Sequence, residues 1–276
     1  MKISILGCGW LGFPLGQALL RKNHIVLGST TSKKKLGILD GNGITPYLIV
    51  APNHLSGDAE NRFWESDLLF LNIPPGRGNP DVLNSYPDTI RAVRSRLESV
   101  ANHGTKKIIF ASSTSVYPRD EGVYSEEDTD PDHTSRPSGK AVLKAEQILL
   151  NSNYFETVVL RFGGLYGYDR HPVRYLAGKN NLSSPNKPVN LIHQDDCIGI
   201  VETILSDEFK PAVYNAVSDG HPPRKTFYQS AAEHYNLTPP TFDPSTESVS
   251  RVISNTKLKE ELNYEFIYPN PLDHSG

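Results

Sequence analysis

The sequence has little of several features that would assign a protein to a class at once. Its 276 residues include only two cysteines, Cys8 and Cys197, which lack the paired spacing of a metal site. No apolar run approaches the roughly 18 residues that a membrane-spanning helix needs. The densest basic run covers residues 33–35, and a net charge of -3 provides no strong field for nucleic acid. These absences indicate a protein of the reducing cytoplasm that binds neither metal, nucleic acid nor membrane.

Alternating segments are what the sequence does contain. Apolar, β-branched runs predict strands, and amphipathic runs between them predict helices. The predicted strands cover residues 2–6, 25–30, 67–76, 106–113 and 156–164, and the predicted helices cover residues 14–24, 84–101 and 136–150. Such alternation is typical of an α/β fold, a doubly wound parallel sheet with helices on both faces.

A glycine-rich turn follows the first predicted strand. In "GCGWLG", Gly7, Gly9 and Gly12 have the spacing G-x-G-x-x-G at the start of a helix. The first glycine permits a tight turn, the second lets a pyrophosphate approach the backbone, and the third lets helix pack on strand. The motif predicts a Rossmann-type dinucleotide site, and the alternative is a tight turn without a ligand.

The end of the second predicted strand bears on the choice of cofactor. NAD sites place Asp or Glu about 20 residues after the glycines, on the ribose hydroxyls. Here "GSTTSKKK" has no acid but has Ser29, Thr30, Thr31 and Ser32, followed by Lys33 and Lys34. Hydroxyls and lysines suit a 2′-phosphate, so we favour NADP over NAD. The alternative is that the lysines cap a solvated helix start.

The amino-acid composition of the chain changes near residue 166, where proline, asparagine and histidine become frequent. We predict a dinucleotide-binding Rossmann domain at 1–165 and a small, loop-rich substrate-binding domain at 166–276. Segments near 187–217 are candidates to return to the first domain. The second unit would cover the carboxyl ends of the strands, where such sheets bind ligands.

Several motifs in order resemble the extended short-chain dehydrogenase/reductase family of nucleotide-sugar epimerases and dehydratases. They are the glycine turn, "SSTSVY", "LRFGGLYG", "VNLIHQDD" and "YNAV", and they span most of the chain. "GWLGFPL" and "RHPVRYLAGK" look like an atypical, epimerase-like bacterial branch. The resemblance implies a nicotinamide cofactor, a small substrate, possible nucleotide-sugar chemistry and a homodimer.

The family's catalytic helix departs from its pattern in this chain. In the family, a Ser or Thr that falls here on Ser113 polarises the substrate, and Tyr-x-x-x-Lys moves the proton and holds the nicotinamide ribose. The aligned segment "PSGKAVLKAEQ" has Ser138 and Val142 instead. An aliphatic hydroxyl is too weakly acidic to replace a phenol, and valine cannot pair with ribose. We expect Ser138 to act as an N-cap or near-cap and the helix to serve in packing.

Other side chains are candidates for the missing chemistry. We predict that Ser113 polarises a carbonyl and that His193 or Tyr166 supplies the proton. Tyr175 and Lys179 form the one Tyr-x-x-x-Lys spacing in the chain, but they lie outside the family's place, and a chance pairing is the alternative.

Charged residues near the predicted cleft are candidates for a substrate phosphate or carboxylate. We assign His171, Arg174, Lys179 and Arg224 to substrate binding. Each has a structural alternative, as a turn residue or as a surface charge. Asp195 and Asp196 also have a structural alternative, as caps of the helix that follows them. We assign to the cofactor Gly7, Gly9, Trp10, Leu11, Gly12, Ser29, Thr30, Thr31, Ser32, Lys33, Ile73, Pro74, Ser112, Gly163 and Gly164.

Three functions are compatible with these residues. The first is an NADP-dependent oxidoreductase or epimerase-like enzyme with a non-standard active site. The second is a non-catalytic sensor that binds NADP. The third is a lyase or isomerase that uses the pocket without redox chemistry. The intact glycine turn favours the first, and the lost tyrosine and lysine argue against it.

Overall fold

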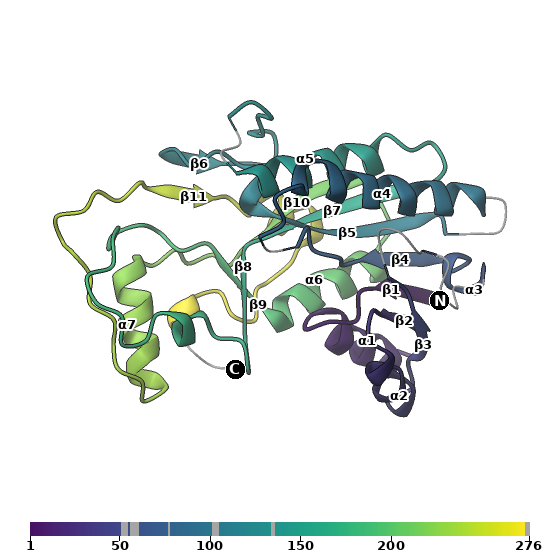
Figure 1. Cartoon of the computed structure of the whole chain (residues 1–276), viewed down its shortest axis with the longest axis horizontal. Coiled ribbons are helices and arrows are strands. Elements are labelled where there is room, and N and C mark those ends of the chain that lie inside the picture. The colour runs from purple at the N-terminus through teal and green to yellow at the C-terminus, as the bar shows by residue number, and fades with distance from the viewer. Residues whose placement is uncertain (51–54, 56–60, 77, 101–104, 134–135, 274–276) are drawn as a thin grey trace.

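The structure is a computed structural model that describes residues 1–50, 55, 61–76, 78–100, 105–133 and 136–273. Its central sheet has seven strands in the order β10-β7-β5-β4-β1-β2-β3, and every neighbouring pair is parallel (Figure 1). The strands are β1 (Lys2–Leu6), β2 (Ile25–Thr30), β3 (Thr45–Leu48), β4 (Leu68–Leu71), β5 (Lys107–Ser113), β7 (Glu156–Phe162) and β10 (Ala212–Ala216). The predicted doubly wound sheet and its five strands are confirmed, although β4 ends at Leu71 and does not continue to residue 76.

Helices cover both faces of this sheet. The helices of the first 165 residues are α1 (Gly12–Arg21), α2 (Lys33–Gly41), α3 (Asn61–Trp64), α4 (Val82–Ser99) and α5 (Pro137–Leu150). Figure 1 shows α4 and α5 on one face, and α1 on the other beside α6 (Gln194–Ser206). The chain adds β2 and β3 on one side of β1 and then β4, β5, β7 and β10 on the other side. Such a switch point between β1 and β4 leaves a crevice at the carboxyl ends of the strands. Among the described residues, no helix has both the length and the apolar character to cross a bilayer.

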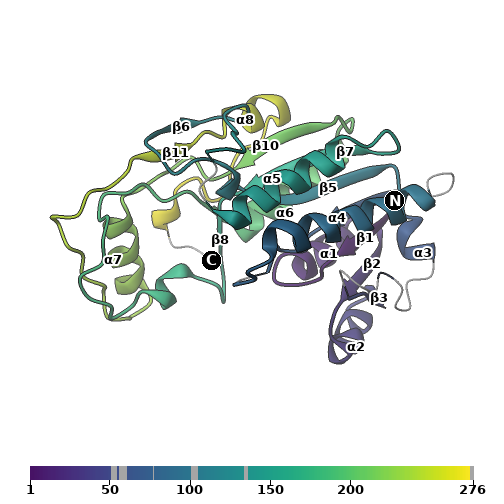
Figure 2. The same ribbon diagram turned by 45° about the horizontal axis from the view of Figure 1, so that its top comes forward.

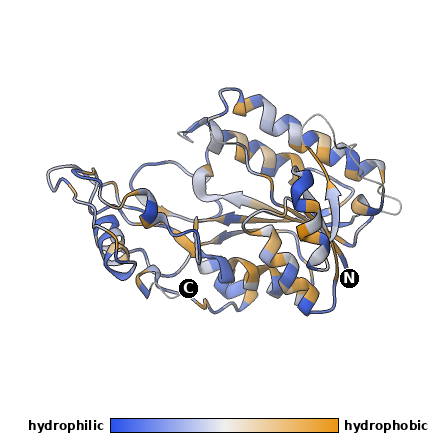
Figure 3. Cartoon of the chain, turned by 60° about the horizontal axis from the view of Figure 1, so that its bottom comes forward, coloured by the Kyte–Doolittle hydropathy of each residue, from blue (hydrophilic) through white to orange (hydrophobic). Residues whose placement is uncertain are grey.

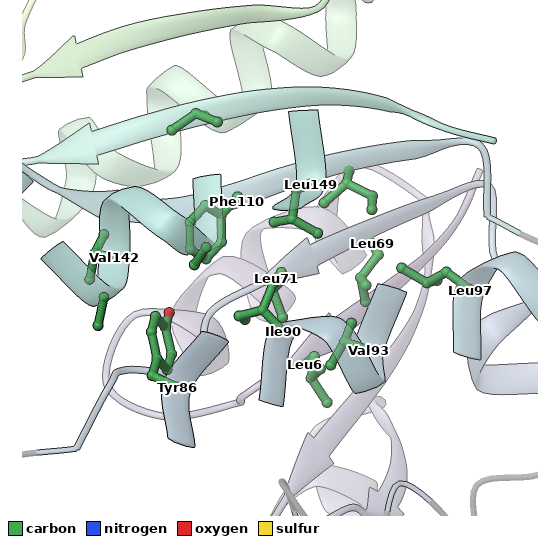
Figure 4. Packing of buried hydrophobic residues seen from close by; sticks show 14 of the residues in the cluster. Leu6, Leu69, Leu71, Tyr86, Ile90, Val93, Leu97, Phe110, Val142 and Leu149 are labelled. Atoms are coloured by element: carbon green, nitrogen blue, oxygen red, sulfur yellow. The ribbon is translucent and has the colours of Figure 1, made fainter. Parts of the chain in front are cut away.

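The core is divided by the sheet into two apolar layers. Leu69 and Leu71 of β4 face α4 and α5, where they pack with Ile90 and Leu149 (Figure 4). The alternating residues of the same strand, Leu68 and Phe70, belong to the layer under α1 and α6, as the two-residue period of a strand requires. Figure 3 shows apolar residues concentrated along the central strands and hydrophilic residues on the outer helix surfaces.

A second unit lies beyond the carboxyl ends of the central strands (Figures 1 and 2). It contains two small parallel pairs, β8 (Gly164–Tyr166) with β9 (Leu191–His193) and β6 (Gly122–Tyr124) with β11 (Arg251–Ile253). Its helix α7 (Arg224–His234) packs on the short helix η2 (Pro172–Tyr175), whereas α8 (Thr256–Leu262) contacts β10. After residue 190 the chain returns to the first unit, because α6 packs beside α1 and β10 is a strand of the central sheet. The predicted division at residue 165 stays a prediction.

Candidate functional site

The glycine turn has three glycines with different tasks. Gly7 has a φ of +108°, and a Cβ there would lie 2.4 Å from the Asn72 carbonyl oxygen. A Cβ at Gly12 would lie 2.3 Å from the carbonyl oxygen of Gly7. At Gly9 a Cβ would meet nothing within 4 Å. Gly7 and Gly12 are therefore required by the packing of the turn, whereas Gly9 leaves open space beside the backbone.

The turn is held in place from the neighbouring strands. The Gly7 N–H donates to Ser29 Oγ at 2.8 Å, and Asn72 Nδ2 donates to the Gly7 carbonyl at 3.0 Å. Helix α1 begins directly after the turn, and no side chain hydrogen-bonds at its N-cap, Leu11. The Phe13 N–H donates to the Gly9 carbonyl at 3.0 Å and Pro14 has no N–H, so the N–H groups of Leu11 and Gly12 and the helix dipole are what α1 offers to an anion. Together with the space at Gly9, this geometry fits a pyrophosphate.

A first cavity of about 460 Å³ lies on the β2 side of the turn. Thr30 and Thr31 line it at the end of β2, and Lys35 lines it from the first turn of α2. No carboxylate lines it in the part of the chain that the structure describes. Ser32 and Lys33 do not line it, so the positive charge at this cavity comes from Lys35, which the sequence analysis did not single out. The lining consists of Leu6, Gly7, Cys8, Gly9, Ser29, Thr30, Thr31, Lys35, Ile49, Asn72, Ile73, Pro74, Pro75, Gly76, Asn79, Ser85, Tyr86 and Thr89.

A second cavity of about 870 Å³ adjoins the first on the side of α5 and β8. Trp10, Leu11, Pro137, Ser138 and Arg170 are among the residues that line it. The two cavities share Gly9, Asn72, Pro74, Pro75, Gly76 and Asn79. They therefore form one groove that crosses the glycine turn.

Helix α5 meets this groove with its first turn only. Its N-cap is Arg136, and Ser138 is the second helical residue, which lines the second cavity. Val142, one turn further on, is 3% exposed and packs in the cluster that contains Tyr86 and Phe110 (Figure 4). Val142 thus presents a methyl surface to the core, and helix α5 supplies one hydroxyl to the groove.

The two serines at the end of β5 are occupied in other contacts. Ser112 Oγ donates to Glu146 Oε1 at 2.5 Å, inside a buried network that includes Arg161. Ser113 Oγ accepts the Ser115 N–H at 3.1 Å and caps a short 3-10 helix. Neither serine lines either cavity among the described residues, and their predicted roles stay predictions.

His193 lies in an aromatic cluster at the start of α6. Its Nδ1 accepts the Asp195 N–H at 3.2 Å, so that His193 is the N-cap of the helix. The alternative in which the two aspartates cap α6 does not hold for the N-cap, and both aspartates lie in the first turn of the helix. The ring centroids of Tyr166 and Tyr268 lie 5.1 and 3.8 Å from the centroid of the imidazole ring. Burial lowers the pKa of His193 and favours the neutral ring, while burial raises the pKa of Tyr166. Neither residue lines the groove, and their catalytic roles stay predictions.

The predicted substrate-binding residues lie in the second unit, outside the lining of both cavities. His171 is buried and caps η2 by accepting the Val173 N–H. Arg174, Tyr175 and Lys179 are exposed. Arg224 donates to the Ser183 carbonyl and lies over the rings of Tyr228 and Phe242, 5.9 and 5.4 Å from their centroids. Their roles in substrate or proton transfer stay predictions.

The charged residue that does line the second cavity is Arg170, which the sequence analysis missed. Its guanidinium lies 5.0 Å from the centroid of the Trp10 ring. Trp10 Nε1 donates to Asp169 Oδ1 at 2.9 Å, and Gln194 Nε2 donates to the Trp10 carbonyl at 2.8 Å. The one sequence signal was the position of Arg170 three residues after "LRFGGLYG".

Of the remaining residues predicted for the cofactor, Ile73 and Pro74 line the first cavity, and Trp10 and Leu11 line the second. Gly163 and Gly164 line neither. A Cβ at Gly163 would lie 2.9 Å from the Asn190 carbonyl oxygen, so this glycine serves the close approach of β9.

The chain is similar to several known proteins. Residues 80–181 match the family described as the NAD dependent epimerase/dehydratase family. Protein YeeZ of Escherichia coli (strain K12) is 32% identical over 274 residues, which cover 98% of this chain and 97% of that protein. The UDP-glucuronic acid 4-epimerase of Bacillus cereus, solved with NAD, has a TM-score of 0.79 at 19% identity, over 99% of this chain and 93% of that chain. The human epimerase family protein SDR39U1, solved with NADPH, has a TM-score of 0.73 at 17% identity, over 98% and 96% of the two chains. At these identities the two structural similarities establish a common fold.

Proposed function

Because the chain belongs to the NAD dependent epimerase/dehydratase family, we propose that it binds NADP(H) across the glycine turn and transfers hydride to or from a small substrate in the second cavity. One observation carries the proposal: the two cavities share Gly9 and join into a single groove. A dinucleotide that crosses the turn would have its adenosine half in the first cavity and its nicotinamide half in the second.

The preference for NADP is supported by the end of β2. Thr30, Thr31 and Lys35 line the first cavity, and no acid does so among the described residues. An acid would accept the two ribose hydroxyls of NAD, whereas hydroxyls and an ammonium group suit a 2′-phosphate. The relatives solved with NAD and with NADPH support a nicotinamide nucleotide without choosing between the two.

The chemistry that this chain's own residues supply in the second cavity is limited. A bound nicotinamide would supply or accept the hydride. Ser138 can donate a hydrogen bond to a substrate oxygen, but an aliphatic hydroxyl is a poor general acid or base at neutral pH. Leu11, Val82 and Leu165 make part of the same wall apolar. We therefore expect slow turnover, because the alkoxide that hydride transfer leaves on a carbonyl substrate would have to take its proton from solvent.

A second candidate function is an NADP-binding protein that catalyses no reaction. It is favoured by the composition of the second cavity, because no Tyr, His, Lys or carboxylate lines it in the described chain. The dyad position at Val142 is closed by packing. The two candidates agree on cofactor binding and differ on turnover.

The test begins with calorimetric titration of the full chain with NADPH and with NADH. Gly9→Ala is the critical variant, because the added methyl group enters the open space at the turn without touching protein. We expect it to keep the thermal stability of the wild type and to weaken NADPH binding at least about tenfold. Gly37→Ala, in α2 and also without a neighbour within 4 Å of the new Cβ, is the matched control and should leave the affinity unchanged.

Turnover is then measured by the absorbance of NADPH, with a panel of aldehydes, ketones, 2-oxo acids and nucleotide sugars. Oxidation of NADPH that Gly9→Ala abolishes supports the oxidoreductase. Tight binding without turnover across the panel leaves the non-catalytic NADP-binding protein as the better description. A wild-type chain that binds neither nucleotide overturns both candidates.

A further inference from the structure

Arg170 is placed by a tight turn that directly follows β8. Gly167 and Tyr168 both have positive φ, at +138° and +43°. The Arg170 N–H donates to the Gly167 carbonyl at 2.8 Å and closes the turn. Figure 2 shows β8 close to the first turn of α5, and Arg170 and Ser138 both line the second cavity. The backbone position of the arginine is therefore fixed at the wall of the groove.

The side chain of Arg170 is also held in place. Its guanidinium lies over the Trp10 ring, 5.0 Å from the ring centroid. Trp10 is held in turn by two hydrogen bonds: its indole N–H donates to Asp169, and its backbone carbonyl accepts from Gln194. A cation over an aromatic face is attracted by the ring and keeps its N–H donors for other partners. Since little side-chain freedom remains to be lost, binding of an anion at this guanidinium costs little ordering entropy.

Arg170 is the charged residue in the lining of the second cavity, and the neighbouring Asp169 carboxylate accepts the Trp10 indole N–H. Among the described residues the arginine forms no ion pair, and no carboxylate lines the second cavity. The walls beside it include Leu11, Pro137 and Leu165, and the residue is only partly exposed. A partly desolvated guanidinium next to apolar walls favours an anionic partner, which it can bind through two parallel N–H donors.

From these contacts we infer that Arg170 binds an oxyanion of the substrate, a carboxylate or a phosphate, in the second cavity. The inference rests on the proposed function, because it names the substrate class of the same groove. The pyrophosphate of the cofactor is the competing ligand. We expect the pyrophosphate at the N-terminus of α1 and beside Gly9, which lines both cavities. Arg170 lines only the second cavity, together with Ser138 and Leu165.

The experiment is a calorimetric titration of the full chain, with and without saturating NADPH, using pyruvate, inorganic phosphate and the neutral amide of pyruvate as probes. We expect at least one anion to bind the wild type and the neutral amide to bind at least about tenfold more weakly. Arg170→Gln should weaken anion binding about tenfold or more while NADPH affinity stays within about twofold. Arg170→Lys should recover part of the loss, because it keeps the charge and loses the planar pair of donors.

Two further arginines make the test specific. Arg91→Gln, in an exposed pair with Asp88 on α4, controls for net charge and should bind the anions as the wild type does. Arg174→Gln removes the exposed arginine of η2, and a loss in this variant alone would overturn the assignment to Arg170.

The assignment is also overturned if neither anion binds the wild type, if Arg170→Gln binds both as the wild type does, or if it loses NADPH affinity by the same factor. The last result would mean that Arg170 binds the phosphates of the cofactor and not the substrate. Failure of the wild type to bind NADPH is separate and refutes the proposed function, since anion binding is also measured without the nucleotide.

Discussion

The buried ion pair beneath the groove allows a prediction whose size can be worked from the structure. Glu146 of α5 and Arg161 of β7 are 1% and 4% exposed, and Arg161 Nη2 lies 2.8 Å from Glu146 Oε2. The same guanidinium donates to the Tyr117 hydroxyl at 2.8 Å and to the Glu126 carbonyl at 2.7 Å. Replacing Glu146 by Leu would leave a buried cation with two neutral acceptors and without its ion-pair partner.

Loss of one partner from a buried pair costs about 3–5 kcal/mol, whereas replacing both partners by apolar residues is close to neutral. Since two acceptors for Arg161 remain, we expect Glu146→Leu to lower the free energy of unfolding by about 3 kcal/mol, a large share of the roughly 5–15 kcal/mol typical of folded proteins. Adding Arg161→Met should restore at least about 1 kcal/mol of that loss. Glu146→Gln keeps a hydrogen-bond acceptor and should cost less than the leucine variant.

The assay is urea unfolding, followed by circular dichroism and by the fluorescence of the buried Trp64, with all four variants of the cycle measured together. The reasoning is refuted if Glu146→Leu costs less than about 1 kcal/mol. It is also refuted if the double variant loses the sum of the two single losses, because the two side chains would then act independently.

Three further predictions concern single side chains. Lys35→Ala should weaken NADPH binding about fivefold and leave NADH binding nearly unchanged, and an equal loss for both nucleotides in calorimetry would remove this lysine from the 2′-phosphate. Ser112→Ala removes the donor to the buried Glu146 carboxylate and should lower the free energy of unfolding by about 1.5–3 kcal/mol without changing NADPH affinity; a loss of affinity at unchanged stability would instead support the predicted role in cofactor binding. Burial lowers the pKa of His193, so the unfolded chain takes up its proton first as the pH falls below about 6.5, and stability should decrease by at most about 2 kcal/mol towards pH 5. His193→Asn should flatten that decrease in pH-dependent urea unfolding, leaving a part from His221, whose pKa burial also lowers; an unchanged slope would contradict the assignment.

Local patterns in the sequence predicted the sheet and the glycine turn because both depend on residues close together in the chain. Each of the five strands was predicted from a local apolar run, and the glycine turn was predicted from the spacing that a tight turn and a close helix require. Helix α5 was expected from its apolar periodicity. The place of Ser138 and Val142 on one face of that helix was also visible, since helix register fixes which residues share a face. That they stand in place of a catalytic dyad stays a prediction.

Pairing across long stretches of chain was not visible in the sequence. The contact of β6 with β11 joins segments more than a hundred residues apart, and so does the contact of Arg170 with the Trp10 ring. Lys33 and Lys35 are two residues apart on one helix, and only the position of α2 decides which of them lines the groove. His193 had the residue type of a proton donor, but the fold uses its Nδ1 as a helix cap.

The edge position of β10 has a consequence for the order in which the protein folds during synthesis. This strand pairs with β7, yet the chain between them first leaves the sheet to form β8, η2 and β9. The ribosome must therefore release the residues that enclose the groove before the sheet can close on its last strand. A nascent chain that ends after β7 presents an unpaired parallel edge, which other chains can join. Protection of that edge, by a chaperone or by rapid arrival of β10, is thus part of what the cell must provide for this fold.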